Sequence, residues 1–139
     1  MFFEVTKSIA RPPAEVWRVL TDKRRLIEGG FGIANIDGDI APGKKLKLWT
    51  EASPGRAFTL KVTAFDAPNR MVWEGGMPLR LFWGTRTYTL DETAQGCRFK
   101  MREDYTGPLA GLIGKSIPDL NPSFATFADA LKRHAEGNA

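Results

Sequence analysis

Apolar and polar residues alternate along much of the chain, which is typical of strands with one buried face. The two longest alternating segments, residues 81–90 and 97–105, meet across a polar turn at 92–96. Two such segments joined by a short turn are predicted to pair as an antiparallel hairpin. Five shorter segments with strand-like patterns precede them: Phe2–Ile9, the segment around Ile33 and Ile36, and residues 44–50, 58–64 and 71–74.

Helical spacing replaces this alternation near the C-terminus. Leu120, Phe124, Phe127 and Leu131 recur at intervals of four, three and four residues, which puts four large apolar side chains on one face of a long helix. Two short helices are predicted after the first strand, with these apolar residues at one-sided spacing: Val16, Trp17 and Leu20 in the first, and Leu26 and Ile27 in the second.

The predicted order is one strand, two short helices, six strands and one long helix. Six consecutive strands with short turns form an antiparallel meander, which twists and curls. The last helix must bury its apolar stripe, and the concave face of the sheet is the large apolar surface on offer. The sequence therefore predicts a single α+β domain, residues 1–139, in which a curved antiparallel sheet of about seven strands grips the C-terminal helix. We expect a space between the helix and the curved sheet.

The hairpin at residues 81–105 is expected to supply polar groups to this space. Phe99, Met101, Glu103 and Tyr105 share one face, and the opposite face carries the charged residues Arg98, Lys100, Arg102 and Asp104. Through the predicted turn, Tyr88 faces Phe99, and Arg86 faces Met101 and lies diagonal to Glu103. Arg86 and Glu103 are therefore expected to be close enough to pair. Such a pair acts either as a structural ion pair or as the polar anchor of an apolar pocket.

Ten residues are predicted to contact a ligand in this space, because they are aromatic, apolar or charged and lie on inward-facing positions. They are Trp73, Trp83, Arg86, Tyr88, Phe99, Met101, Glu103, Tyr105, Phe124 and Phe127. Among them, Glu103, Arg86 and Tyr88 are the candidates for acid–base chemistry. Trp49 shares a face with Lys45 and Lys47, so it is predicted to lie outside, where it suits a homodimer contact.

Composition excludes several functional classes. The formal net charge is +4, yet the basic residues are scattered among acidic ones, so no nucleic-acid partner is predicted. No apolar run approaches the ~20 residues that span a bilayer. The N-terminus shows no signal peptide, and the single cysteine, Cys97, cannot form an internal disulfide, so a cytoplasmic location is predicted.

Residues for metal, cofactor or triad chemistry are sparse. The one histidine, His134, is predicted at the surface near the end of the last helix, and there is no cysteine pair. Gly29-Gly30-Phe31-Gly32 lacks the spacing of a phosphate loop. No metal and no cofactor are therefore predicted.

Three segments of the chain resemble a known superfamily. Residues 10–17 (ARPPAEVW), 85–90 (TRTYTL) with 97–107 (CRFKMREDYTG), and 118–131 are similar to the START-related superfamily, also called SRPBCC, the helix-grip fold of birch-pollen allergens. The resemblance covers nearly the whole chain. It implies one of several activities: lipid or hormone binding, polyketide cyclisation or dehydration, or activation of a heat-shock ATPase.

Three functions follow as hypotheses. The first is binding of a small hydrophobic ligand, such as a lipid or an aromatic or polyketide-like molecule, between sheet and helix. The second is a cyclase or dehydratase in which Glu103 and pocket tyrosines act as acid or base. The third is a protein-interaction module that uses Trp49 and the outer sheet face.

Overall fold

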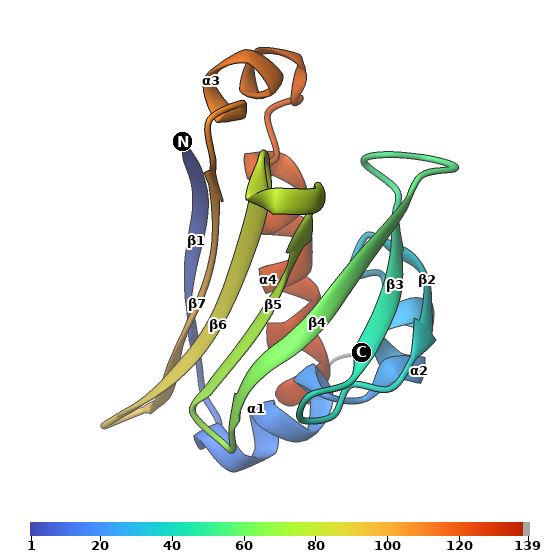
Figure 1. The fold of residues 1–139 in the computed structure, drawn as a ribbon. Coiled ribbons are helices and arrows are strands. Elements are labelled where there is room, and N and C mark those ends of the chain that lie inside the picture. Colours follow the sequence, from blue (N-terminus) through green and yellow to red (C-terminus); the bar gives the residue numbers. More distant parts are fainter. Residues whose placement is uncertain (138–139) are drawn as a thin grey trace.

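A curled antiparallel sheet with helices on its concave side makes up the computed structural model, which describes residues 1–137 (Figure 1). Its strands are β1 (Phe2–Ile9), β2 (Ile33–Gly38), β3 (Lys45–Thr50), β4 (Ala57–Asp66), β5 (Arg70–Gly76), β6 (Trp83–Thr93) and β7 (Gly96–Thr106). They lie in the order β1-β7-β6-β5-β4-β3-β2, so the first strand pairs with the last. The predicted six-strand meander, the sheet of seven strands and the α+β class are confirmed.

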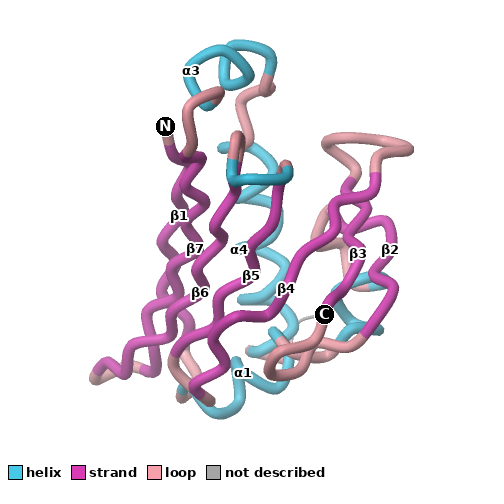
Figure 2. Tube along the Cα trace, viewed as in Figure 1, coloured by secondary structure: helices cyan, strands magenta, loops and turns pink. Residues whose placement is uncertain are grey.

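The helices lie at the ends and on the inner side of the sheet (Figure 2). They are α1 (Pro13–Leu20), α2 (Lys23–Glu28), the short α3 (Ala110–Ile113) and α4 (Asn121–Ala135), with 3-10 turns η1 (Pro78–Arg80) and η2 (Gly114–Ser116). The predicted stripe explains the position of α4: Phe124, Phe127 and Leu131 are buried against the sheet. The sequence did not predict α3, η1 or η2. No helix in the described part of the chain is long and apolar enough to cross a membrane.

The β6–β7 hairpin differs from the predicted one in its register. Its turn is shorter, because Thr93 already pairs with Gly96. As a result Arg86 faces Glu103 directly, Tyr88 faces Met101 and Leu90 faces Phe99. The predicted pairing of Tyr88 with Phe99 was wrong by two residues, a slip that keeps each side chain on its predicted face.

A β-bulge in β4 also changes a predicted face. The register against β5 shifts between Val62 and Ala64, so that Ala64 pairs with Val72 and Phe65 pairs with Met71. After the bulge Phe65 takes the inward position and packs edge-on against Trp17, with ring centroids 5.2 Å apart. The regular alternation of residues 58–64 would place Ala64 on the face of Val62, and the bulge moves it to the opposite face.

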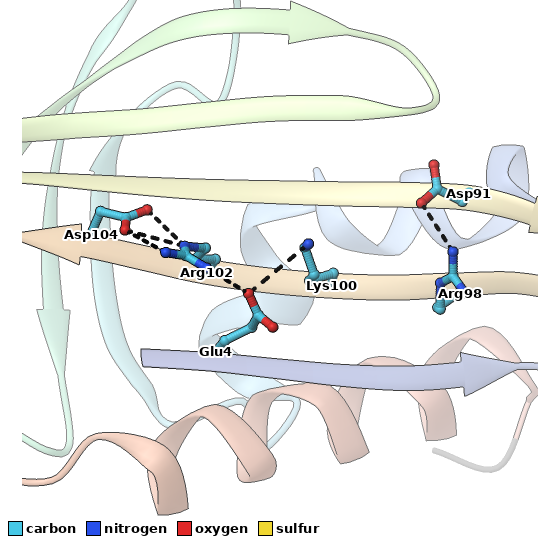
Figure 3. Close-up of polar contacts among 6 residues, drawn as sticks. All are labelled: Glu4, Asp91, Arg98, Lys100, Arg102 and Asp104. Atoms are coloured by element: carbon cyan, nitrogen blue, oxygen red, sulfur yellow. Dashed lines mark hydrogen bonds and ion pairs between the residues drawn. The ribbon is translucent and has the colours of Figure 1, made fainter. Parts of the chain in front are cut away.

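The outer face of β1, β6 and β7 carries a network of charges (Figure 3). Arg102 pairs with Asp104 on its own strand at 3.0 Å and with Glu4 on β1 at 3.2 Å. Arg98 and Asp91 pair more loosely, at 3.9 Å. The prediction that this face of β7 is charged and faces water is confirmed, which leaves the alternate residues of β7 for the interior.

Candidate functional site

A cavity of about 480 Å³ lies between the concave face of the sheet and the first half of α4. Side chains of Leu48, Phe58 and Leu60 form the wall on the side of β3 and β4, and Phe124 and Phe127 form the wall on the side of α4. This volume falls in the range of roughly 300–1,000 Å³ that small-molecule sites occupy. The space predicted between helix and sheet is present, although much of the surrounding interior is tightly packed.

A hydrogen-bonded cluster of Arg86, Glu103 and Tyr105 borders the cavity. Arg86 Nε donates to Glu103 Oε1 at 3.0 Å, and Arg86 Nη2 donates to Glu103 Oε2 at 3.4 Å. The Tyr105 hydroxyl also donates to Glu103 Oε2. Since Arg86 and Glu103 are cross-strand partners, the register of the sheet itself brings the two charges together.

Aromatic rings shield this cluster from water. The Phe124 ring lies 5.2 Å from the Arg86 guanidinium carbon, within cation–π range. Phe82 stacks on Tyr105 with ring centroids 5.3 Å apart, and Phe3 meets Tyr105 edge-on at 6.2 Å. The Arg86 and Glu103 side chains are consequently only 12% and 14% exposed. The ion pair is held by both its mutual charge and its aromatic surroundings.

Burial and charge set the protonation of the cluster. Burial alone disfavours the charged guanidinium, but Glu103 beside it holds the pKa of Arg86 above its usual value. Burial, followed by the negative charge of Glu103, raises the pKa of the Tyr105 hydroxyl. At neutral pH the cluster therefore contains a cation and a neutral phenol, both of which donate to one carboxylate.

The hydrogen-bond donor that the cluster leaves available is on Arg86. Its Nε and Nη2 atoms serve Glu103, and the guanidinium also acts on the nearby Tyr88 hydroxyl, but among residues 1–137 no hydrogen bond of good geometry uses its Nη1 atom. Both oxygens of Glu103, in contrast, already accept hydrogen bonds, so a substrate would have to compete with Arg86 and Tyr105 for them. The arrangement suits donation of a hydrogen bond to a ligand oxygen better than removal of a proton.

Tyr88 lies deeper than the cluster and is fully buried. Its ring packs edge-on against Trp73 at 5.1 Å and near Phe127 at 6.0 Å. No residue in the described part of the chain forms a hydrogen bond with its hydroxyl or with the Trp73 indole nitrogen. Burial raises the pKa of Tyr88 to about 12, against the opposing effect of the Arg86 charge.

Because of this raised pKa, we expect the protein to lose stability at alkaline pH, and we expect the loss to be smaller in Tyr88→Phe. In the unfolded chain Tyr88 ionises near pH 10, while in the folded protein it keeps its proton to about pH 12. Between these values the unfolded state binds fewer protons, so stability falls as pH rises, by up to ~3 kcal/mol from this residue. Denaturant unfolding of the wild type and Tyr88→Phe at pH 7–11.5 measures the difference. Parallel pH profiles of the two proteins would contradict it.

The predicted site residues fall in three places in the structure. Six of the ten line the cavity: Arg86, Met101, Glu103, Tyr105, Phe124 and Phe127. Trp73, Tyr88 and Phe99 instead lie in the packed core and do not line the cavity. Trp83 is on the outer face, where its indole donates to Glu74 at 3.1 Å and Arg80 stacks on it at 4.3 Å.

Several cavity-lining residues were missed by sequence reasoning. Phe82 was not selected, although it stands at the start of a predicted strand beside Trp83. Gly84 contributes to the lining from an inward-facing position of β6, opposite Tyr105. Ile113, Ile117 and Pro118 come from the irregular segment before α4. Phe82 and Gly84 carried a signal, because both fall within the alternating pattern, as do the unselected wall residues Leu48, Phe58 and Leu60.

The single histidine packs against the core, and the single cysteine is part of it. His134 is not a plain surface residue, since its Nε2 lies 3.0 Å from the Gly29 carbonyl oxygen and its ring lies 5.2 Å from Phe31. Cys97 is buried, and burial raises the pKa of its thiol. In residues 1–137, no three His, Cys, Asp or Glu side chains are grouped so that they could hold a metal ion.

Comparisons with solved structures show that this fold is shared. A protein from Mesorhizobium loti, MLL2253, has a TM-score of 0.72 at 18% identity, with 100% of this chain and 99% of that chain covered. DynU16, a protein in the dynemicin biosynthetic locus, has a TM-score of 0.73 at 21% identity, covering 97% of this chain and 47% of that one. The di-domain ARO/CYC StfQ of the steffimycin pathway has a TM-score of 0.70 at 16% identity, covering 98% and 51%. At these identities the likeness concerns the fold alone.

Sequence comparison identifies the family. A search of curated proteins found no match. A comparison with protein families, however, aligns residues 2–136 with the family described as polyketide cyclase / dehydrase and lipid transport. That alignment includes every strand of the sheet, the whole of α4 and the Arg86–Glu103–Tyr105 cluster. The chain therefore belongs to the polyketide cyclase/dehydrase and lipid transport family, of the SRPBCC type.

Proposed function

We propose that this protein binds a small, largely apolar molecule in the cavity beneath α4. The observation that carries the proposal is the combination of a cavity of about 480 Å³ with one buried ion pair at its edge. Apolar and aromatic walls provide affinity without direction, and a few placed polar groups fix the orientation of a ligand. The family includes lipid transport in its description, which agrees with this role.

The cluster also suggests which polar group the ligand carries. Arg86 is already neutralised by Glu103 at 3.0 Å, so a second full negative charge beside it meets repulsion from the carboxylate. A neutral acceptor, such as a ketone, ester or phenol oxygen, accepts a hydrogen bond from Arg86 Nη1 without that repulsion. We therefore infer a ring-containing or acyl ligand with a neutral oxygen at one end.

Native mass spectrometry of the purified protein tests this proposal directly. We expect a retained molecule of several hundred daltons, or, after delipidation, uptake of a fluorescent fatty acid ester that competing apolar ligands displace. A fatty acid ester and the matching free acid provide the internal comparison, and the ester is expected to bind more tightly. Failure to retain or take up any member of a broad panel of lipids and polycyclic aromatics would contradict the proposal.

A cyclase or dehydratase is the second candidate. It is favoured by the presence of a carboxylate and a tyrosine hydroxyl in direct hydrogen bond at the cavity edge. It is opposed by the three hydrogen bonds that Glu103 already accepts and by the raised pKa values of Tyr88 and Tyr105, which keep both phenols protonated at neutral pH and make them weak acids. A synthetic poly-β-keto thioester separates the two functions: ring formation supports the enzyme, and unchanged substrate that displaces the probe supports binding alone.

The protein-interaction hypothesis depends on Trp49. The side chain is partly exposed and lies in a shallow surface depression with Asn35, Glu51 and Pro54. It is accessible to a partner, including a second copy of this chain. Sedimentation velocity of the wild type and Trp49→Ala tests this alternative, and a single monomeric species in both would contradict the homodimer.

A further inference from the structure

Large apolar side chains are exposed at one end of the molecule, around the cavity mouth. Of those in residues 1–137, five are exposed, and four of them are Met1 (52%), Met77 (38%), Leu79 (91%) and Leu112 (70%). We call these four residues the apolar rim. The fifth, Phe2 (53%), lies on the outer face of the sheet, where the Arg102 guanidinium is 3.8 Å from the centre of its ring.

Backbone contacts hold the segments of the rim together. The Leu109 amide donates to the Leu81 carbonyl at 2.9 Å, which ties the segment before α3 to the end of η1. The Met1 side chain packs against the other end of this segment. Its sulfur lies beside Gly114, 2.7 Å from the position that a Cβ atom would take on that glycine. Figure 1 shows α3, the N-terminus and the β5–β6 connection at the same end of the sheet. Met77 and Ile113 line the cavity directly, so the rim borders its mouth.

The backbone under Leu79 is in an unusual conformation. Leu79 and the following Arg80 both have positive φ, at 59° and 52°. Left-handed backbone costs roughly 1–2 kcal/mol for a residue with a side chain, and neither position is glycine. This conformation leaves Leu79 projecting into solvent with 91% of its surface exposed. A side chain held outward in this way gains free energy only when another apolar phase covers it.

The segments that carry Met77, Leu79 and Leu112 have only basic charged side chains. Residues 75–90 and 105–118, which carry Met77, Leu79 and Leu112, contain arginine and lysine but no aspartate or glutamate. Arg80 directly follows Leu79 and pairs with Glu74 at 3.5 Å, and Lys115 lies three residues after Leu112; both basic residues are exposed. Projecting apolar side chains flanked by basic ones match an interface of anionic headgroups above acyl chains.

We propose that the apolar rim docks on the surface of an anionic lipid bilayer, with Leu79 and Leu112 inserted at the level of the headgroups. Side chains that project from separate segments enter a fluid interface without needing a partner of complementary shape. A stable protein interface, in comparison, buries about 800 Å² on each side. This inference goes beyond ligand binding, and it places the cavity mouth against the bilayer, so that an apolar ligand enters without crossing water.

Vesicle co-sedimentation tests the inference without using the cavity. The wild type is expected to bind vesicles of phosphatidylcholine with phosphatidylserine more tightly than vesicles of phosphatidylcholine alone, and to dissociate as salt rises. The double variant Leu79→Asn/Leu112→Asn is expected to lose about tenfold or more in partitioning. Asparagine tolerates positive φ, so the first substitution is compatible with the observed backbone. Lys115→Gln should weaken only the additional binding that phosphatidylserine provides. Arg98→Gln, which removes the same charge at the far end of β7, should leave that binding unchanged.

Several outcomes would overturn the proposal. Absence of wild-type binding to anionic vesicles at low salt is one, and unchanged binding of the double asparagine variant is another. If the rim instead mediates contact between two copies, the wild type will self-associate in sedimentation velocity and the double variant will not. Probe uptake from detergent-free solution reports the cavity separately, so a failure at the rim is distinguishable from a failure of the proposed ligand binding.

Discussion

Replacing Glu103 with leucine is expected to lower the free energy of unfolding by about 3–5 kcal/mol. The substitution leaves the Arg86 guanidinium, whose side chain is only 12% exposed, without its counter-ion. It also removes the acceptor of the Tyr105 hydroxyl. Among the ion pairs in residues 1–137, this one has the least exposed side chains. Urea unfolding of the wild type and the variant at pH 7 measures the loss.

A double variant shows whether the loss comes from the uncompensated charge. Arg86→Met/Glu103→Leu removes both charges and is expected to recover most of the stability, because apolar groups of similar volume often replace a buried ion pair without cost. Asp91→Leu is the matched control, since it breaks the exposed pair with Arg98 and should cause little change. If Glu103→Leu is as mild as Asp91→Leu, water reaches Arg86 freely, and the cluster is not the dry anchor that we propose.

The fold was predictable because both kinds of periodicity in this sequence are long and regular. The four-three-four spacing from Leu120 to Leu131 specifies one helix face, and the alternation in β6 and β7 specifies two strand faces. The prediction that Arg86 pairs with Glu103 required only that both side chains lie on the inward face of the hairpin. The register error did not disturb it, since a slip of two residues keeps every side chain on the same side.

What failed was the distinction between inward and cavity-lining positions. Trp73, Tyr88 and Phe99 point inward as predicted, but the aromatic ring of Phe127 covers Tyr88 and Phe99, with centroids 6.0 and 6.1 Å away. Which inward residues are covered depends on where α4 crosses the sheet. That position is set by the loop before α4, whose sequence has no regular period, so the pattern of the strands does not contain this information. The bulge at Val62 is invisible for a similar reason, because it depends on pairing with β5.

The empty volume itself depends on a residue that lacks a side chain. Gly84 lies on β6 facing Tyr105, on the same face as Arg86, and lines the cavity. A Cβ at this position would meet the Tyr105 ring at 3.4 and 3.6 Å and the Gly75 carbonyl oxygen at 3.8 Å, and the φ of Gly84 is not in the left-handed region. Neither backbone conformation nor close backbone approach therefore requires glycine here. This contrasts with neighbouring Gly75, where a Cβ would lie 2.2 Å from the Thr59 carbonyl oxygen. The absence of a side chain at Gly84 serves to keep space in the cavity.

Gly84→Leu is accordingly expected to abolish ligand binding while it preserves the fold. The leucine side chain would project beside Tyr105 and occupy the volume next to the Arg86–Glu103 pair. We expect affinity for a displaceable fatty acid ester probe to fall by about a hundredfold, which corresponds to ~2.8 kcal/mol. Stability should change by only about 1 kcal/mol, because strand glycines are themselves unfavourable.

The neighbouring residue supplies the control for this experiment. Thr85→Leu adds an apolar side chain at the next position of β6, on the outer face, where Thr85 pairs with Glu74 and Asp104. It should leave probe affinity unchanged. If both variants bind the probe as the wild type does, the ligand does not occupy the space beneath α4, and the proposed site must be abandoned. If both variants lose binding because they are destabilised, circular dichroism will show the loss of structure. Gly84→Ala then tests the site, since the structure accommodates its added methyl group. We expect this variant to stay folded and to show a smaller drop in probe affinity.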